Sequence, residues 1–210
     1  MTAPASGIGR LRRFIADMTS LVGGAWQDKD EPAIVEFGRK LLGELVSHDD
    51  WLPDSCAKCP PYGYAQNLLW CDPFERFSIV SFVLAPSAST PVHDHAVWGM
   101  VGMLRGSEIS QAYARDESGG PLHLGPATTL KPGDVEILSP AAGDIHKVNN
   151  ALADCGSVSI HVYGGNIGAV RRRVFDVTTG GAQLFVSGYT NQLQPNLWDR
   201  SVEMRTAPAG

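Results

Sequence analysis

The strongest constraint on the fold is a series of short extended segments that begins after Tyr62 and is divided by turn residues. The expected strands are Tyr64–Trp70, Phe77–Ala85, Trp98–Arg105, Ser107–Arg115, Ala127–Leu130, Val135–Leu138, Ile145–Asn149 and Ser157–Tyr163. The 23 glycines and 14 prolines of the chain also favour many turns over long helices. Short strands at this spacing predict a small antiparallel, jelly-roll-like barrel. A barrel of this size encloses only a small ligand.

The first quarter of the chain has helical rather than alternating periodicity. Apolar residues recur at helical spacing from Ile8 to Val22, and Gly23-Gly24 is expected to end this helix. A second helix is expected to start at Asp30-Glu31-Pro32 and to continue to Val46. We therefore predict one mainly β domain over residues 1–210, with a helical cap in 1–60, a barrel in 61–190 and a tail in 191–210.

Charge and hydropathy argue against several classes of partner. The net charge is −5, and the basic run Arg171–Arg173 is too short for a nucleic-acid-binding arm. No apolar stretch reaches the roughly 20 residues that span a bilayer, and charged residues interrupt the N-terminal apolar pattern, so no signal peptide is expected. We expect a cytoplasmic protein with reduced cysteines. Cys56 and Cys59 form a CxxC without a second pair, and we interpret them as plain loop thiols.

Six histidines are candidates for chemistry. His48 and His123 are expected to be solvated or locally hydrogen-bonded. The other four lie on expected strands or strand ends: His93, His95, His146 and His161. His93 and His95 are two residues apart on an extended segment, so their side chains point to the same side. Burying two adjacent imidazoles without a shared partner would leave polar nitrogens unsatisfied, which favours a metal site.

The residues around these histidines resemble the cupin superfamily. The first cupin motif is matched by His93, His95 and Gly106, and the second, with one spacing a residue longer than usual, by Gly133, Pro140, Gly143, His146 and Asn150. Many cupins have a glutamate ligand where this chain has Gly99, and the nearest downstream acid, Glu108, lies beyond Gly106. Three neutral histidines would leave a divalent metal free to accept two anionic ligands. Zinc would also accept three histidines and water, so the ligand set leaves iron and zinc open.

Ser159, His161 and Tyr163 alternate with apolar residues on the last expected strand. Their side chains therefore share one face, where a hydroxyl, an imidazole and a phenol can form a hydrogen-bonded relay that orients the Tyr163 hydroxyl. The alternative is a strand with three separately satisfied polar side chains that face a wet barrel mouth.

Together, the three histidines and this strand resemble the thiol dioxygenases of the cysteine dioxygenase type I family, over about Tyr64 to Tyr163. The resemblance implies a non-haem Fe(II) held by His93, His95 and His146, with Ser159, His161 and Tyr163 as an outer relay. It also implies an oxidoreductase that adds both atoms of O2 to a thiol to give a sulfinate. The cysteine that is cross-linked to the tyrosine in mammalian members is matched by Gly99, so no cross-link is expected.

The stretch from Tyr64 to Asn67 bears on the substrate. Mammalian cysteine dioxygenases have an arginine at its third position, where this chain has Gln66, and in this it resembles the 3-mercaptopropionate dioxygenases. Glutamine offers only neutral donors in place of a charged fork. A carboxylate substrate still needs a cation, and the candidates are Arg171, Arg172 and Arg173. Arg172 is preferred by resemblance, and the alternative is a solvated surface cluster.

The leading hypothesis is an Fe(II) thiol dioxygenase for 3-mercaptopropionate, with Tyr64, Gln66 and Arg172 at the substrate. Its partners would be a small thiol and O2, without nucleic acid or membrane. Cysteine or mercaptosuccinate remain alternative substrates. A zinc or nickel cupin hydrolase or isomerase, and a non-catalytic cupin that binds a small acid, remain alternative functions.

Overall fold

The computed structural model describes residues 7–23, 31–116 and 120–195. Gly24 and Asp30 of the expected helix ends, and most of the expected tail, lie outside these residues. The described helices are α1 (Gly9–Val22), α2 (Glu31–Val46) and α3 (Asp54–Ala57). The described strands are β1 (Tyr64–Cys71), β2 (Ser78–Leu84), β3 (Val92–His93), β4 (Gly99–Arg105), β5 (Glu108–Ala114), β6 (His123–Leu130), β7 (Val135–Leu138), β8 (His146–Asn150), β9 (Ser157–Tyr163), β10 (Arg172–Phe175) and β11 (Ala182–Phe185).

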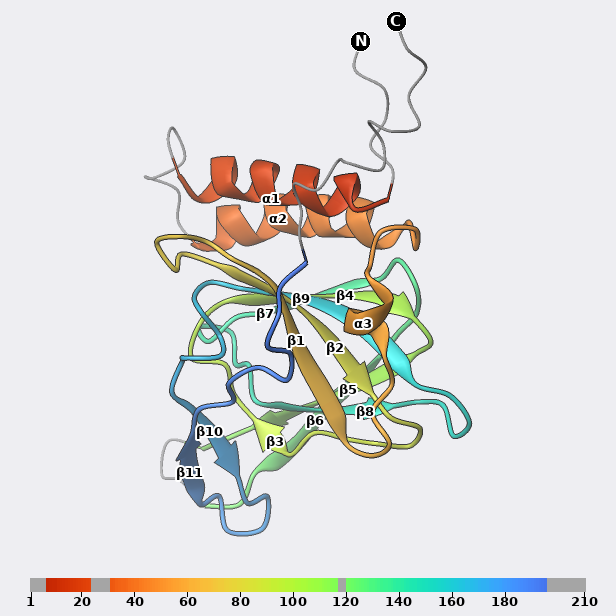
Figure 1. The fold of residues 1–210 in the computed structure, drawn as a ribbon. Coiled ribbons are helices and arrows are strands. Elements are labelled where there is room, and N and C mark those ends of the chain that lie inside the picture. The colour runs from red at the N-terminus through yellow and green to blue at the C-terminus, as the bar shows by residue number, and fades with distance from the viewer. Residues whose placement is uncertain (1–6, 24–30, 117–119, 196–210) are drawn as a thin grey trace, which may run out of the picture.

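The strands form two antiparallel sheets that face each other (Figure 1). One sheet has the order β1-β2-β9-β4-β7 and the other β11-β10-β3-β8-β5-β6. Helices α1 and α2 lie side by side over the five-stranded sheet, and α2 packs on β4 and β7. The predicted mainly β, jelly-roll-like barrel with an N-terminal helical cap is therefore confirmed. Among the described residues, no helix has the length and apolarity needed to cross a bilayer.

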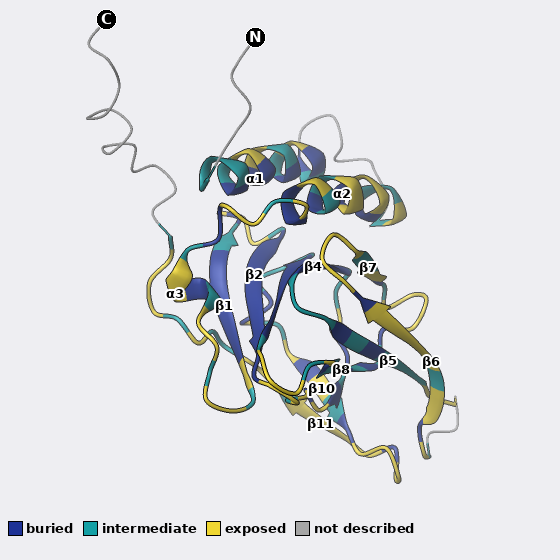
Figure 2. Cartoon of the chain, turned by 90° about the vertical axis from the view of Figure 1, so that its right-hand side faces the viewer, coloured by how far each residue is buried: buried dark blue, intermediate teal, exposed yellow. Residues whose placement is uncertain are grey.

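Burial follows from this layering (Figure 2). Every residue of β2 and of β9 is buried, because the helices cover the outer face of their sheet and the barrel interior covers the other. Helix α1 contributes one apolar face, with buried Leu11, Phe14 and Met18. Strand β6, in contrast, is exposed over most of its length. The central strand β9 can therefore hold polar side chains away from bulk water on its inner face.

The sequence prediction missed three strands, and it began a fourth too late. Strand β3 has only two residues, and β10 and β11 form a hairpin at the end of the six-stranded sheet. All the residues of β11 are exposed or half-buried, so it lacks the alternation that predicts a strand. Strand β6 starts at His123 rather than Ala127, and it includes Gly125 and Pro126. Proline is tolerated there because β6 is an edge strand.

The expected loop thiols also need a correction. Cys56 is buried in the single-turn helix α3, whereas Cys59 is exposed beyond its end. Both are free thiols. Their side chains therefore occupy different environments, in keeping with two unconnected cysteines rather than one site.

Close packing of α2 on β4 gives a stability prediction. A methyl group at Gly102 would lie 2.9 Å from Leu42 Cγ and 2.9 Å from Val46 Cγ1. We expect Gly102→Ala to lower the free energy of unfolding by about 1–3 kcal/mol, because the buried helix has to shift. The matched control is Gly43→Ala on helix α2, where the atom nearest to the added methyl group would be 3.8 Å away.

Gly43→Ala should stabilise the protein by about 0.5–1 kcal/mol, since glycine is unfavourable inside a helix. Urea unfolding followed by circular dichroism measures both variants. Equal stabilities of Gly102→Ala and the wild type would contradict the tight contact.

Candidate metal centre

Three histidines from two neighbouring strands meet at one end of the barrel interior. His93 ends β3, His146 begins β8, and the two residues lie directly opposite each other in the antiparallel pair. His95 follows β3 by two residues and faces the same point. Each pair of rings has its centroids 4.9 Å apart, and one nitrogen from each ring lies within 4.8 Å of the others. These three side chains could hold a single metal ion.

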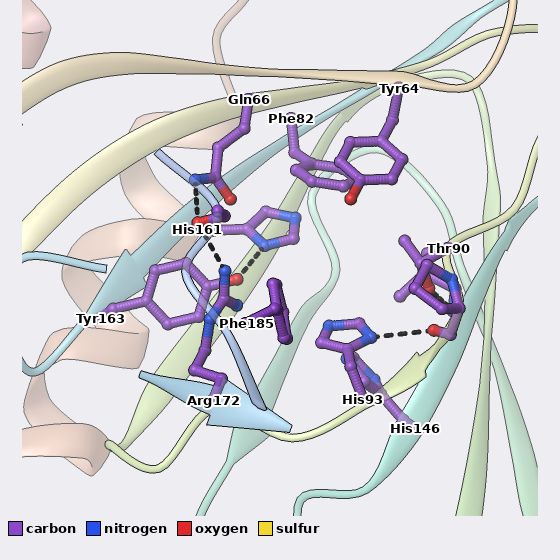
Figure 3. Close-up of a pocket in the computed structure, with 13 residues that line it drawn as sticks. Tyr64, Gln66, Phe82, Thr90, His93, His146, His161, Tyr163, Arg172 and Phe185 are labelled. Carbon is purple, nitrogen blue, oxygen red and sulfur yellow. Dashed lines mark hydrogen bonds between the residues drawn. The ribbon is translucent and has the colours of Figure 1, made fainter. Parts of the chain in front are cut away.

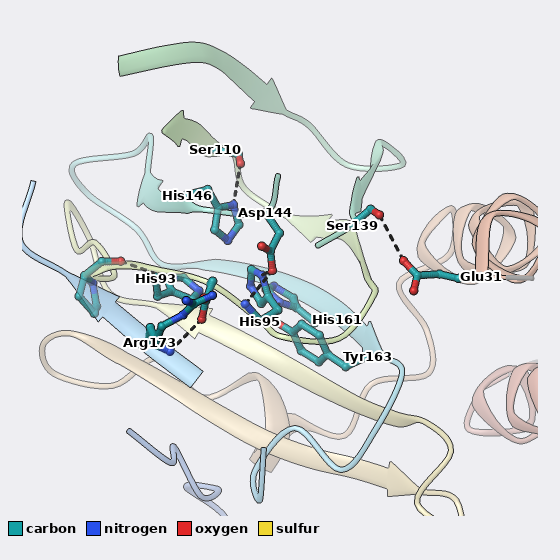
Figure 4. A network of polar contacts seen from close by, with 12 residues as sticks. Glu31, His93, His95, Ser110, Ser139, Asp144, His146, His161, Tyr163 and Arg173 are labelled. Carbon is teal, nitrogen blue, oxygen red and sulfur yellow. Dashed lines mark hydrogen bonds and ion pairs between the residues drawn. The ribbon is translucent and has the colours of Figure 1, made fainter. Parts of the chain in front are cut away.

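The bonds behind two of these rings determine which nitrogen is free (Figure 4). His93 Nδ1 is 3.0 Å from the carbonyl oxygen of Pro91, and His95 Nδ1 is 3.3 Å from Asp144 Oδ2. A carbonyl or carboxylate oxygen only accepts, so both rings carry their proton on Nδ1 and leave Nε2 bare. His95 Nε2 is buried and has no hydrogen-bond partner within the described residues. A buried ring nitrogen without a hydrogen-bond partner is expected of a histidine that binds a metal ion through that nitrogen.

His146 is held in the same way through a hydroxyl group. Its Nδ1 is 3.0 Å from Ser110 Oγ. The Ser110 hydroxyl also lies close enough to Glu136 to oppose the rise of its pKa. The Ser110 oxygen can accept the Nδ1 proton of His146. Nε2 of the third ring is then also free for a ligand role.

The protonation state of the three rings suits a metal. Burial, the largest cause, lowers the pKa of His93 to about 4. Burial likewise lowers the pKa values of His95 and His146 well below the ordinary value. All three are therefore neutral at neutral pH, which is the form that binds metal ions. The unpartnered Nε2 of His95, the short distances between the three rings and their neutral state together fit a site for a divalent metal ion.

Gly99, where the sequence comparison with the cupin motif expects a glutamate ligand, lies directly opposite Tyr163 in the pairing of β4 and β9. A Cβ atom at Gly99 would be 3.0 Å from Tyr163 Cδ1 and 3.2 Å from Cε1. The Tyr163 ring also stacks on His95, with centroids 5.5 Å apart. A carboxylate at this position would displace the tyrosine, so packing keeps the site at three histidines.

Strand β9 brings the three predicted relay residues together in one hydrogen-bonded chain. Ser159 Oγ lies 2.8 Å from His161 Nε2, and His161 Nδ1 lies 2.7 Å from the Tyr163 hydroxyl oxygen. All three side chains are buried. Burial lowers the pKa of His161 to about 3, so this ring is neutral, and burial raises the pKa of Tyr163 above its usual value.

A small pocket joins the relay to the histidines (Figure 3). Its lining includes His93, His146, His161 and Tyr163, and its cavity volume is about 30 Å³. Tyr64 lies at its edge and is 41% exposed.

The structure separates the three candidate arginines. Arg171 is exposed. Arg173 pairs with Asp94, with its Nε 2.6 Å from Oδ2, so the Asp94 carboxylate is turned toward this arginine. Arg172 alone lines the pocket, and it is buried.

Arg172 is only partly satisfied. Its Nη2 donates to Ser187 Oγ at 2.7 Å, and its guanidinium lies over the Phe185 ring at 4.8 Å. Its Nε is buried and has no hydrogen-bond partner within the described residues, and no carboxylate there forms an ion pair with it. Burial lowers the pKa of Arg172, but the group remains a cation. A buried, unpaired cation favours an anionic ligand.

Gln66 is connected to Arg172 through Ser187, to which both side chains donate a hydrogen bond. Its Nε2 donates to Ser187 Oγ at 3.1 Å and to the Gly188 carbonyl at 2.8 Å, so both amide hydrogens are used. Ser187 then accepts from Gln66 and from Arg172. The sequence suggested that Gln66 meets the substrate with its own donors, whereas in the structure those donors hold the segment that positions Arg172.

Sequence reasoning missed several residues of the site. Ser187 and Phe185 follow or end the unpredicted strand β11, so nothing local marked them. Glu108 and Ser110 alternate on β5 and are both buried. Their spacing on an expected strand, read as an inward-facing pair, could have found them.

The two remaining histidines lie outside the site. His123 begins β6 and its Nε2 is 2.9 Å from Asp116 Oδ2, which is the local bond expected from the sequence. His48 follows the end of α2 and is half-buried. Neither lines the pocket.

No known family model matches the chain. Among solved structures, it is similar to an oxalate oxidase in complex with the substrate analogue glycolate, with 17% identity over 53% of this chain and 56% of the other, and a TM-score of 0.42. An uncharacterized protein with a double-stranded β-helix domain from Klebsiella pneumoniae matches at 17% identity over 62% and 91%, with a TM-score of 0.41. A cupin 2 conserved barrel domain protein from Rhodopseudomonas palustris matches at 14% identity over 56% and 70%, also at 0.41. The chain thus spans only 56% of that oxalate oxidase.

The hydroxyl behind His146 gives a prediction about metal affinity. Ser110→Ala should weaken binding of a divalent metal ion, tested with Fe(II) as the probe, by about 10- to 100-fold, because the Nδ1 proton loses its acceptor and the ring loses its orientation. Anaerobic calorimetric titration measures this change. The control is Ser107→Ala, whose hydroxyl donates to the Leu130 carbonyl at 2.9 Å. Equal affinities of the two variants would contradict the role of Ser110.

Proposed function

We propose that this protein is a non-haem iron thiol dioxygenase that oxidises 3-mercaptopropionate with O2 to its sulfinate. The observation that carries the proposal is a cluster of three histidines without a carboxylate ligand, two of which, His93 and His146, line the same pocket as His161 and Tyr163 of the relay. Fe(II) on the Nε2 atoms of His93, His95 and His146 would supply thiolate binding and dioxygen activation.

The charges of the pocket favour a substrate with two anionic groups. None of the residues that line the pocket in the described structure is acidic, and Arg172 is the only permanent cation among them. Three neutral ligands leave the metal with its full positive charge. A thiolate and a carboxylate on one small molecule would match these two positive centres.

Each residue has a separate task in this proposal. Arg172 would bind the substrate carboxylate, with its unpartnered Nε as a donor. Gln66 and Ser187 hold the guanidinium in place. Phe185 and Phe82 line the pocket and exclude water around the reacting sulfur. Tyr163 would hydrogen-bond the substrate beside the metal.

The same charges favour 3-mercaptopropionate over the two alternative thiols. Cysteine carries an ammonium group, for which the described lining offers no carboxylate. Mercaptosuccinate carries a second carboxylate, and Arg172 is the only arginine or lysine in the lining. Either extra charge would be desolvated without a partner.

Metal analysis coupled to oxygen uptake tests the function. Anaerobically purified protein should contain iron and consume one O2 per 3-mercaptopropionate, and both atoms of labelled O2 should appear in the sulfinate. Cysteine, mercaptosuccinate and cysteamine complete the panel. Iron without oxygen uptake on any of these thiols would reject the proposal and favour a hydrolase, an isomerase or a binding protein.

Arg172 gives a prediction about substrate affinity. Arg172→Lys should raise the KM for 3-mercaptopropionate about 10- to 100-fold, the equivalent of about 1.5–3 kcal/mol, because the planar fork and Nε are lost. The KM for cysteamine, which has no carboxylate, should change little. Steady-state oxygen uptake measures both, and the exposed Arg171→Lys is the control. An equal change for both thiols would contradict carboxylate binding by Arg172.

A further inference from the structure

Glu108 is a buried carboxyl group on the side of the relay away from the pocket. It is the first residue of β5 and is 0% exposed. Its Oε1 accepts hydrogen bonds from Ser157 Oγ at 2.8 Å and Ser159 Oγ at 3.2 Å, while Oε2 has no partner within the described residues. None of these bonds involves the three metal-binding candidates. Glu108 is therefore a buried acid that the proposed function leaves unused.

Through Ser159, this acid is connected to the pocket. The chain runs from Glu108 Oε1 to Ser159 Oγ, then 2.8 Å to His161 Nε2, and from His161 Nδ1 a further 2.7 Å to the Tyr163 hydroxyl. His161 and Tyr163 line the pocket. Three side chains thus connect a buried carboxyl group to the place where the substrate would lie.

Hydrogen-bond directions in this chain depend on one another. Ser159 has one hydroxyl proton, and neutral His161 has one ring proton. An ionised Glu108 can only accept, so Ser159 donates to it and accepts from His161 Nε2. His161 Nδ1 is then a bare acceptor, and Tyr163 donates to it. The Tyr163 oxygen in this state offers only lone pairs to the pocket.

A neutral Glu108 reverses every bond. Its proton lies on Oε1 and is donated to Ser159, and Ser159 donates to His161 Nε2. His161 then carries its proton on Nδ1 and donates to the Tyr163 oxygen. The Tyr163 proton is now free to point into the pocket. The two states differ by a single bound proton.

We propose that Glu108 is a positioning residue whose proton decides whether the Tyr163 hydroxyl accepts or donates a hydrogen bond in the pocket. Its catalytic consequence rests on the proposed function. With ionised Glu108, a substrate thiol loses its S–H proton to Tyr163, and Tyr163 passes its own to His161 Nδ1. The Nε2 proton then moves to Ser159, and the Ser159 proton to Glu108. The thiol becomes a thiolate and Glu108 becomes neutral, so protons and charge balance.

The surroundings of Glu108 make both states accessible. Burial, the largest cause, raises its pKa to about 7, opposed by the hydroxyls of Ser157 and Ser159 and reinforced by the charge of Glu136 on β7. His161 and Tyr163 are the other titratable groups on this side, both on β9. The residues opposite Glu108 on β8 and β6 are Asn150 and Leu130, which do not titrate.

The tautomer of His161 in metal-free protein tests the inference without turnover. Nitrogen-15 histidine NMR distinguishes Nδ1–H from Nε2–H, and a His161→Gln spectrum assigns the signal. In the wild type, the proton should move from Nε2 to Nδ1 as the pH falls through about 7, the pKa of Glu108. In Glu108→Gln, whose amide is neutral and can donate to Ser159, His161 should stay Nδ1–H. One unchanged tautomer in the wild type, or wild-type behaviour of Glu108→Gln, would overturn the inference.

Two serines on the same carboxyl oxygen form a matched control, which also decides the question if Glu108→Gln does not fold. Ser159→Ala cuts the chain and should abolish the tautomer change. Ser157→Ala leaves the chain intact and should keep the change, with its midpoint raised because Glu108 loses a bond that stabilises its ionised form. Identical spectra for the two variants would contradict the chain.

Activity provides a separate readout. The pH profile of kcat/KM should lose its limb near pH 7 in Glu108→Gln and keep a limb, at raised pH, in Ser157→Ala. A tautomer change without oxygen uptake on any thiol would reject the proposed function and leave the inference standing. Oxygen uptake without a tautomer change would reject the inference about Glu108 and leave the proposed function standing.

Discussion

The enclosure of four histidines in one barrel, three of them buried and His93 half-buried, is the constraint on which the rest of this structure depends. Each ring loses hydration inside the barrel, so each ring nitrogen that faces the barrel wall needs a hydrogen-bond partner there. The wall supplies a backbone carbonyl, a carboxylate and two serine hydroxyls. Because these partners occupy Nδ1 in the three rings that face one another, the remaining nitrogens converge on one point. The metal-binding geometry is thus a consequence of satisfying the opposite edges of the rings.

Two of these partners are serine hydroxyls. Ser159 is hydrogen-bonded to both Glu108 and His161, whereas Ser110 is hydrogen-bonded to His146 and opposes the rise of the pKa of the half-buried Glu136. A hydroxyl can both donate and accept, so Ser159 can transmit the state of a buried acid to an imidazole. Ser110 orients a candidate metal ligand, and the chain through Ser159 reaches the tyrosine of the pocket. Both acids have raised pKa values because of burial.

The helical cap matters for the site although it contributes no residue to the pocket. By covering the outer face of the five-stranded sheet, α1 and α2 let β9 be buried on both faces. The polar side chains on the inner face of β9 then bond to one another rather than to bulk water. Gly99 on the neighbouring strand leaves room for the Tyr163 ring, which packs against His95. Packing and ligand number are therefore coupled at this position.

Local periodicity in the sequence was enough to predict the barrel, the helical cap, the shared side of His93 and His95 and the shared face of the β9 residues. These features depend on backbone geometry over a few residues, which the order of side chains determines. The edge hairpin of β10 and β11 escaped prediction because exposed strands lose their alternation. The meeting of His146 with the other two histidines was anticipated only from a motif resemblance.

Only the tertiary structure decided which arginine enters the pocket, what Gln66 bonds to and how deeply Glu108 is buried. Each answer depends on residues distant in the chain, such as Ser187 beside Gln66 and Ser159 beside Glu108. The sequence by itself determined which side chains could take part in chemistry. Their charge states and hydrogen-bond directions were decided by burial, because desolvation is a property of the assembled barrel and not of any segment.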